Sequence, residues 1–269
     1  MRKLLSIILF ALVLPAKAQF TELGLFGGGT NFLGDVGNQN IHAPQSWVGG
    51  LAFRYQFNKH YGIRFMGNQG MLINDDALSS WQARQNRNQH FRTSIWEAGV
   101  MLEINFLPYI TGSKKMNHSP YIFGGIAIFG FNPQAQYTDG RWYDLQPLGT
   151  EGQGTAQNAT GRYGLAGMSL PFGIGYRWSI GPSFSVALET GLRTTSTDYL
   201  DDTSSKYVNT NQLAEDRGAL AAYFADRSIT DTDKSGYDRG NSANNDWYVF
   251  SGIHIYFALT PKNERCSRF

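Results

Sequence analysis

The sequence predicts an all-β protein, namely an eight-stranded antiparallel transmembrane β-barrel with short periplasmic turns and long extracellular loops. Three observations lead to this fold class. The chain begins with an export signal, eight later segments alternate apolar and polar residues, and the connections between those segments are alternately short and long. In a membrane-spanning barrel strand every second side chain faces lipid while the others face the lumen, so strict alternation is the expected pattern.

Residues 1–18 have the features of a secretory signal peptide. Two basic residues, Arg2 and Lys3, precede the apolar run of residues 4–14, and the segment closes with an A-x-A cleavage site. The apolar run is too short to span a bilayer as a helix, and no run of about 20 apolar residues follows it. We therefore expect an exported mature chain that begins near Gln19 and is not a helical membrane protein.

The composition excludes several classes of protein. Charged residues make up 16% of the chain and aromatic residues 14%, whereas an ordinary soluble domain has about 25% charged residues. Removal of residues 1–18 takes away three basic and no acidic residues, so 20 Lys and Arg remain against 21 Asp and Glu. This balance gives no electrostatic basis for binding nucleic acid. A single cysteine, Cys266, excludes an intramolecular disulfide and a cysteine-based zinc site.

The eight alternating segments are the predicted barrel strands. The clearest runs from Met168 to Ile180, where every even-numbered position is apolar or aromatic. Only Gly181-Pro182-Ser183 separates it from the next segment, which is typical of a periplasmic turn. The first and fifth segments are less regular because glycine is frequent there. In chain order the segments are Phe20–Thr30, Trp47–Phe57, Tyr61–Met71, Ser94–Phe106, Tyr121–Phe131, Met168–Ile180, Phe184–Arg193 and Trp247–Leu259.

An even strand count places both ends of the barrel domain, residues 19–259, on the periplasmic side. Residues 260–269 should then form a periplasmic C-terminal tail. The long connections, which should be extracellular, are about residues 31–46, 72–91, 132–166 and 196–246. The fourth is too long to be a plain connection. Helix-forming residues and an apolar set predict a short helix within Asn209 to Arg227.

Eight charged residues are predicted to face the lumen. They are Glu22, Arg54, Arg64, Glu97, Glu103, Arg177, Glu189 and Arg193. An eight-stranded barrel is only wide enough for its own side chains to fill, and unpaired charges inside it would be costly. Because four acids face four bases, we expect ion pairs that plug the interior. The alternative is that these charges line a solvated interior without pairing.

Other candidate sites have simpler explanations. The five histidines lack metal-ligand spacing, and His254 is expected to form hydrogen bonds in the lumen. Ser251 is close to His254 in sequence, but alternation places them on opposite faces, which argues against Ser/His catalysis. The carboxylates of Asp198, Asp201 and Asp202 could hold calcium, but they lack the spacing of a calcium motif and are interpreted as the solvated start of a loop. We expect no catalytic residue, metal site or cofactor.

Five strings of residues, in order along nearly the whole mature chain, carry a resemblance to a known family. They are Glu22–Val36, Pro120–Ala135, Asp139–Gly154, Thr197–Asp202 and Arg239–Phe250. Together they resemble PorG, the outer-membrane barrel of the type IX secretion system. The resemblance implies a non-enzymatic protein in the lipid of the cell outer membrane, with no small-molecule substrate. Its partners would be a PorK-like lipoprotein and a PorN-like periplasmic ring protein, which it would help to anchor.

The C-terminus departs from that family, whose members usually finish close to the last strand. Lys262, Arg265 and Arg268 in the tail are candidate contacts with the ring, and a frayed terminus is the alternative. The turn from Leu107 to Pro120 is the other expected docking face. Three other functions remain open: a general structural barrel without a secretion role, an outer-membrane lipid-modifying enzyme, and a diffusion channel.

Overall fold

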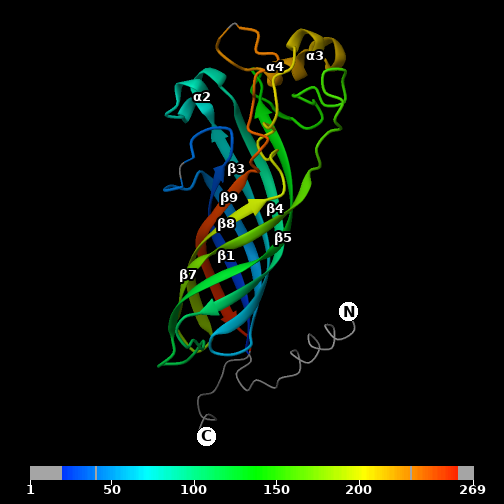
Figure 1. Ribbon diagram of the computed structural model, residues 1–269. Helices are drawn as coiled ribbons and strands as arrows, with labels where there is room; N and C mark the ends of the chain where they lie inside the picture. The colour runs from blue at the N-terminus through cyan, green and yellow to red at the C-terminus, as the bar shows by residue number, and fades with distance from the viewer. Residues whose placement is uncertain (1–19, 40, 231, 260–269) are drawn as a thin grey trace, which may run out of the picture.

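Eight long strands close into a barrel in the computed structural model, which describes residues 20–39, 41–230 and 232–259 (Figure 1). Each pairs antiparallel with the next long strand in the chain, and β1 closes the ring with β9, from Glu22 opposite Ala258 to Leu33 opposite Trp247. The predicted eight-stranded antiparallel barrel is therefore confirmed. Its strands are β1 (Phe20–Leu33), β2 (Ser46–Gln56), β3 (Tyr61–Asp75), β4 (His90–Asn105), β5 (His118–Gln136), β7 (Ala166–Ser179), β8 (Phe184–Thr195) and β9 (Trp247–Ala258).

The two ends of the barrel differ, and we call them the turn end and the loop end. At the turn end the connections are residues 57–60, 106–117 and 180–183, and β1 begins and β9 ends there. The predicted signal peptide, residues 1–18, and the tail with Lys262, Arg265 and Arg268 lie outside the described residues.

The four connections at the loop end pack together, and we call them the loop-end cap (Figure 1). They comprise residues 34–45, 76–89, 137–165 and 196–246. Their regular elements are the 3₁₀ helix η1 (Asp76–Leu78), α2 (Gln82–Arg87), the short strand β6 (Trp142–Asp144), α3 (Thr210–Arg217) and α4 (Ala219–Ala225). None of the helices in the described residues is long and apolar enough to cross a membrane.

Three strands run at least four residues further toward the loop end than the sequence predicted. The alternation predicts an end at Met71, a start at Ser94 and an end at Phe131, but β3 continues to Asp75, β4 begins at His90 and β5 continues to Gln136. Strand pairing continues beyond the alternating residues because the hydrogen bonds between strands join main-chain groups and need no lipid-facing side chain. The β5 extension also pairs with β6.

The predicted helix within Asn209–Arg227 is present as two helices, because Gly218 lies at φ 92° between them. This φ favours glycine. The Asn209 side chain accepts a hydrogen bond from the amide of Gln212 at 3.1 Å, which caps α3. Helix α2 lies within a predicted loop. It has no side-chain cap at its N-terminus and no buried residue, so neither of those signals marks it in the sequence.

The outer wall is apolar. The outward positions of the alternating segments leave aliphatic and aromatic side chains exposed, with fractions of 61% for Leu25, 65% for Leu51 and 61% for Ile174. The ring is closed, so its backbone groups are paired within the sheet and the wall has no open edge. Such a surface matches the hydrocarbon interior of a bilayer.

Side chains fill the interior in three layers. Near the turn end Phe20 packs with Tyr109 and Ile110, which fold back from the connection 106–117. The middle layer holds the charged residues. Near the loop end lies an apolar cluster of residues from β1, β2, β3, β4, β5 and β9, into which Leu200 inserts from the cap. The barrel is therefore plugged along its length by its own side chains.

Candidate functional site

Glu103 is the centre of the charged layer inside the barrel. Its carboxylate lies 2.6 Å from Arg177 Nη2, 3.3 Å from Arg64 Nε and 3.8 Å from Arg54 Nη1. All four side chains are at most 1% exposed. One carboxylate among three guanidinium groups leaves an excess of positive charge, which other acids must balance.

Two further glutamates supply that balance. Glu22 pairs with Arg54 and accepts a 2.5 Å hydrogen bond from Thr111 Oγ1, which belongs to the connection 106–117. Glu189 lies 2.6 Å from Arg64 Nη1 and accepts a 2.7 Å hydrogen bond from the Tyr121 hydroxyl. The six charged residues therefore form one neutral chain of contacts across the lumen.

The remaining two charged residues form a separate pair nearer the loop end. Arg193 Nε lies 3.5 Å from Glu97 Oε2, which also accepts a 2.6 Å hydrogen bond from the Tyr248 hydroxyl. The structure thus brings all eight predicted lumen residues into ion pairs.

Aromatic rings occupy the space between these ion pairs. Each of the four lumen arginines lies over a ring, where its cation meets the negative face of the π system. The distances from the guanidinium carbon to the ring centroid are 4.3 Å for Arg54 and Tyr256, 5.0 Å for Arg64 and Phe123, 3.8 Å for Arg177 and Tyr121, and 4.5 Å for Arg193 and Phe250. Ion pairs and aromatic rings therefore fill this part of the lumen together.

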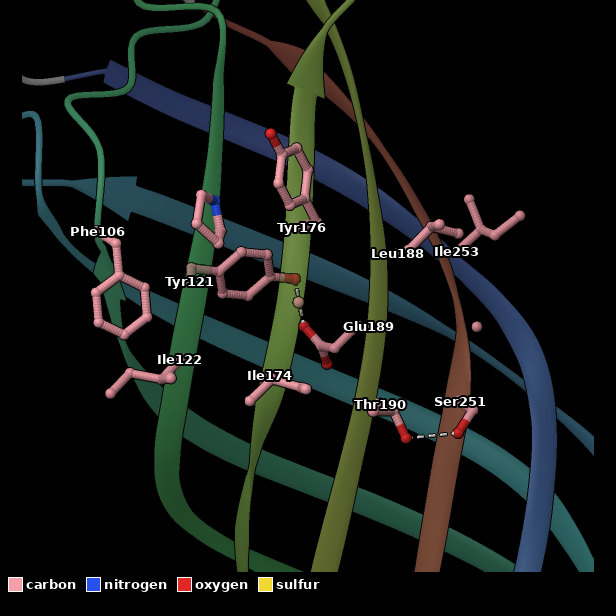
Figure 2. Close-up of a pocket in the computed structure, with 13 residues that line it drawn as sticks. Phe106, Tyr121, Ile122, Ile174, Tyr176, Leu188, Glu189, Thr190, Ser251 and Ile253 are labelled. Atoms are coloured by element: carbon pink, nitrogen blue, oxygen red, sulfur yellow. Dashed lines mark hydrogen bonds between the residues drawn. The ribbon is translucent and has the colours of Figure 1, made fainter. Parts of the chain in front are cut away.

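Ser251 and His254 lie on opposite faces of β9, as the alternation predicts. His254 is buried in the lumen, 3.2 Å from Arg64 Nη1, and stacks on Phe26. Ser251 faces outward into a hollow of about 710 Å³ on the outer wall, where its hydroxyl lies 2.7 Å from Thr190 Oγ1 (Figure 2). The two side chains do not form a nucleophile and base pair.

Glu151 organises the loop-end cap from within. Its carboxylate is fully buried and accepts hydrogen bonds from the amides of Ser204 at 2.9 Å and Ser205 at 3.0 Å. It also pairs with Arg239 at 3.1 Å. The contact joins residues that are 88 positions apart, so Glu151 fastens the third connection to the fourth.

Arg239 extends this network to the end of helix α4. Its guanidinium donates to the carbonyls of Phe224 at 3.3 Å and Ala225 at 3.2 Å, and also to the carbonyl of Asp202. Cations at a helix C-terminus satisfy carbonyls that have no partner within the helix. Arg239 therefore holds the helix and the third and fourth connections in one arrangement.

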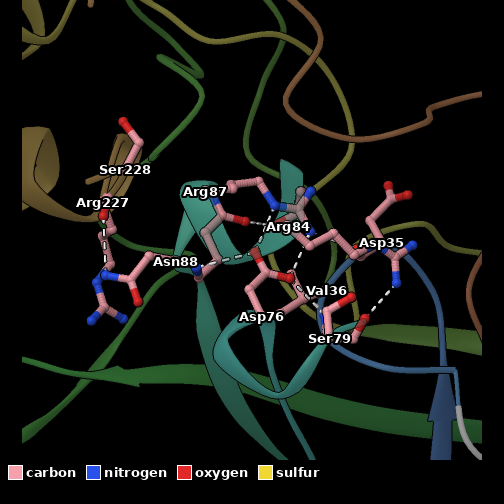
Figure 3. A network of polar contacts seen from close by, with 12 residues as sticks. Asp35, Val36, Asp76, Ser79, Arg84, Arg87, Asn88, Arg227 and Ser228 are labelled. Atoms are coloured by element: carbon pink, nitrogen blue, oxygen red, sulfur yellow. Dashed lines mark hydrogen bonds and ion pairs between the residues drawn. The ribbon is translucent and has the colours of Figure 1, made fainter. Parts of the chain in front are cut away.

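A second network fastens the first two connections (Figure 3). Arg87 binds the Asp76 carboxylate with two hydrogen bonds, at 2.7 and 2.9 Å. The same guanidinium donates to the carbonyls of Asp35 at 2.6 Å and Arg239 at 2.9 Å. Because bidentate arginine–carboxylate pairs have a fixed geometry, Arg87 sets how three of the four connections meet.

The carboxylates of Asp198, Asp201 and Asp202 are buried, with exposed fractions of 7%, 2% and 0%. The interpretation of this segment as a solvated loop start is therefore wrong. Their oxygens are used to build the cap: Asp201 accepts from the amides of Val36 and Thr203 at 3.0 and 2.9 Å. In the described part of the chain no three His, Cys, Asp or Glu side chains are grouped to hold a metal ion.

Burial shifts the acidity of this segment. Desolvation raises the pKa of Asp198 to about 7. A hydrogen bond from the Ser204 side chain opposes this shift, and the nearby charges of Asp35 and Glu151 add to it. Desolvation also raises the pKa of Asp202 to about 6, although Arg239 and the hydroxyls of Thr150 and Tyr163 oppose it. The cap therefore contains carboxylates that titrate near neutral pH.

Sequence reasoning missed Glu151, Arg239 and the Asp76–Arg87 pair as organising residues. Glu151 and Arg239 lie within two of the strings that resemble the PorG family, Asp139–Gly154 and Arg239–Phe250. One signal in the sequence could have identified Glu151 and Arg239. Each is a charged residue within one of these strings, in a loop whose sequence does not alternate. The strings in the loops are thus largely the residues that hold the cap together.

Solved structures of small barrels resemble this fold at very low sequence identity. Ail, the attachment invasion locus protein of Yersinia pestis, matches with 9% identity and a TM-score of 0.41 over 90% of this chain and 99% of that chain. Neisserial surface protein A matches with 7% identity, a TM-score of 0.40, and coverage of 90% and 97%. The N-terminal β-barrel domain of Pseudomonas aeruginosa OprF matches with 9% identity and a TM-score of 0.37, over 90% of this chain and 98% of that chain.

No curated protein sequence matches the chain. A family model does: the one described as "Domain of unknown function (DUF6089)" matches residues 1–219. The match covers more than half of the chain and spans the first seven barrel strands, from β1 to β8. The chain therefore belongs to the DUF6089 family.

Proposed function

We propose that this chain is a structural, non-enzymatic barrel of the cell outer membrane. The observation that carries the proposal is a closed ring that is apolar outside and filled inside. The wall suits a bilayer, while ion pairs and aromatic rings fill the lumen of a barrel that is only wide enough for its own side chains. We assign to such a protein the role of a fixed attachment point in the membrane.

We further propose that it helps to anchor the periplasmic ring of a type IX protein secretion system, formed by a PorK-like lipoprotein and a PorN-like protein. Support comes from the resemblance of the five strings to the PorG family. The ring contact belongs at the turn end, which would face the periplasm. The tail residues Lys262, Arg265 and Arg268 remain candidate contacts, outside the described residues.

The connection 106–117 offers fewer contacts than its length suggests. Tyr109 and Thr111 are 0% and 3% exposed because they plug the barrel. Leu107 is 43% exposed and Lys115 lies on the surface. We assign any ring contact made by this connection to its exposed residues, and we assign its buried residues to closing the lumen.

Site-specific photo-crosslinking in native membranes tests the anchor. A photoreactive residue at Lys115 should capture PorK-like or PorN-like partners, while one at Ile229, which is 68% exposed in the cap, should not. Deletion of the gene should abolish secretion of type IX cargo. Normal secretion together with an empty Lys115 sample would overturn the anchoring role and favour the general structural barrel.

The same preparation separates the other functions. The sealed lumen predicts no steady conductance in planar bilayers, and a conductance that changes in Arg54→Gln or Arg177→Gln would indicate a channel. An altered lipid profile on deletion, restored by the unmodified protein and not by Ser251→Ala, would indicate a lipid-modifying enzyme.

A further inference from the structure

A polar hollow of about 540 Å³ lies at the base of the loop-end cap, beside the ends of β1, β8 and β9. Carboxylates and amides dominate its lining, including Asp35, Asp198, Asp246, Asn241, Asn244 and Asn245. Among the described residues that line it, none is Lys, Arg or His. The hollow therefore offers hydrogen-bond acceptors and negative charge without a cation of its own.

Asp198 is the side chain in this hollow that lacks a full set of partners. It is only 7% exposed, and although the Ser204 side chain acts on the carboxylate as a hydrogen-bond donor, the Oδ2 atom has no hydrogen-bond partner. Its neighbours differ: Asp246 Oδ2 accepts from the amide of Leu200 at 2.9 Å, and Asp35 Oδ2 accepts from the amide of Asn241 at 2.6 Å. A buried carboxylate oxygen without a donor costs free energy, and a ligand that supplies a donor removes that cost.

The surroundings of Asp198 and Asp246 are acidic. The charges of Asp35 and Glu151 add to the burial that raises the pKa of Asp198, and those of Asp201, Asp198 and Asp35 do the same for Asp246. The two arginines whose charges act on Asp35 are already engaged. Arg87 binds the Asp76 carboxylate and the Asp35 carbonyl, and Arg84 donates to the Gly37 carbonyl.

We propose that this hollow receives the guanidinium group of an arginine side chain from a partner protein at the loop end. A guanidinium presents a planar fork of N–H donors, which suits a carboxylate flanked by amide oxygens. A bare metal ion fits less well, because no three of the carboxylates are grouped to hold one and the hollow is far larger than an ion. The inference goes beyond the anchoring role, since it concerns the opposite end of the barrel.

Binding of N-acetyl-arginine amide to the full mature protein in lipid nanodiscs tests the proposal. Calorimetric titration at pH 8, where Asp198 is mostly ionised, should show at least about tenfold tighter binding than for N-acetyl-citrulline amide, a neutral compound of the same shape. Asp198→Asn, which removes charge without changing size, should lose about the same factor. The matched control Asp216→Asn, on the exposed face of α3, should bind like the unmodified protein.

A second measurement does not depend on any variant. Hydrogen exchange of the unmodified protein should slow in residues 194–198 and 241–247 when the arginine amide is added. Equal binding of the arginine and citrulline amides, or unchanged exchange in both segments at a saturating concentration, would overturn the proposal. Slowing by Ca²⁺ alone, with no effect of the arginine amide, would overturn it in favour of a metal site.

Discussion

The lumen and the loop-end cap both bury charged side chains, but they neutralise them with different partners. In the lumen four glutamates meet four arginines, and every carboxylate has a guanidinium within 4 Å. In the cap the buried carboxylates outnumber the buried arginines. The buried carboxylates belong to Asp76, Glu151, Asp198, Asp201, Asp202 and Asp246. Among the described residues of the cap, Arg239 is the buried arginine.

The cap neutralises its acids mainly with backbone amides and hydroxyls. Asp201 and Glu151 each accept from two main-chain amides, and Asp202 accepts from the hydroxyls of Thr150 and Tyr163. Such bonds fix the course of a connection that has no strand ladder. In the lumen the sheet already fixes the backbone, so the glutamates need no main-chain amides. They pair with arginines and accept further hydrogen bonds from hydroxyls, such as that of Thr111 on Glu22 and that of Tyr121 on Glu189.

Breaking the lumen network at its centre should have the largest effect. Glu103→Gln removes the carboxylate shared by three arginines and leaves buried charge without compensation, at a cost of about 3–5 kcal/mol in the free energy of unfolding. Urea unfolding in lipid vesicles should show the loss. Glu215→Gln, the same change on the exposed surface of α3, should unfold like the unmodified protein, and equal midpoints for both variants would contradict the central role of Glu103.

Breaking the cap should spare the barrel. Arg239→Ala removes the partner of Glu151 and three carbonyl contacts, which should make local opening of residues 197–246 easier by about 3 kcal/mol. Hydrogen exchange measures this opening, and the urea midpoint of the barrel should change little. Arg162→Ala, at an exposed position of the same cap, is the control. A barrel midpoint that falls as far as in Glu103→Gln would show that the two networks are one.

The acid excess of the cap should make its stability depend on pH. The pKa values of Asp198 and Asp202 are raised from 3.8 to about 7 and about 6, mainly by burial. Through these two groups the folded cap binds more protons than the unfolded chain, so the stability that they contribute is full below pH 3.8 and is lost as pH rises through 6 and 7. Exchange rates corrected for intrinsic pH dependence should report this trend, and Asp198→Asn should flatten its upper part.

The smallest effect concerns backbone strain in the cap. Gly218 lies at φ 92° with no atom near the position of a Cβ, so Gly218→Ala adds strain without a clash. We expect a loss of about 1 kcal/mol or slightly more, visible as faster exchange in α3 and α4. Gly161→Ala, where there is also open space but no such φ, should leave exchange unchanged. Identical behaviour of the two variants would contradict the strain argument.

The difference between a barrel fixed by strand pairing and a cap fixed by side-chain contacts explains what could be predicted from the sequence. A closed sheet imposes a period of two on every strand, so alternation located the strands and indicated which charges, such as Arg64 and Glu189, face inward. No period governs the cap. The contact between Asp201 and Val36 joins residues 165 positions apart, and the inward fold of Tyr109 and Thr111 depends on the space at the turn end.

The seam between β1 and β9 fixes the order in which the molecule can be assembled. One edge of β1 finds β2 early in the chain, but its other edge gains a partner only when Trp247 to Ala258 is in place. Until then the sheet has two open edges, whose amides and carbonyls cannot remain unsatisfied in hydrocarbon. Closure of the ring must therefore wait until Trp247 to Ala258 is in place, and a product that stops before residue 247 cannot complete it.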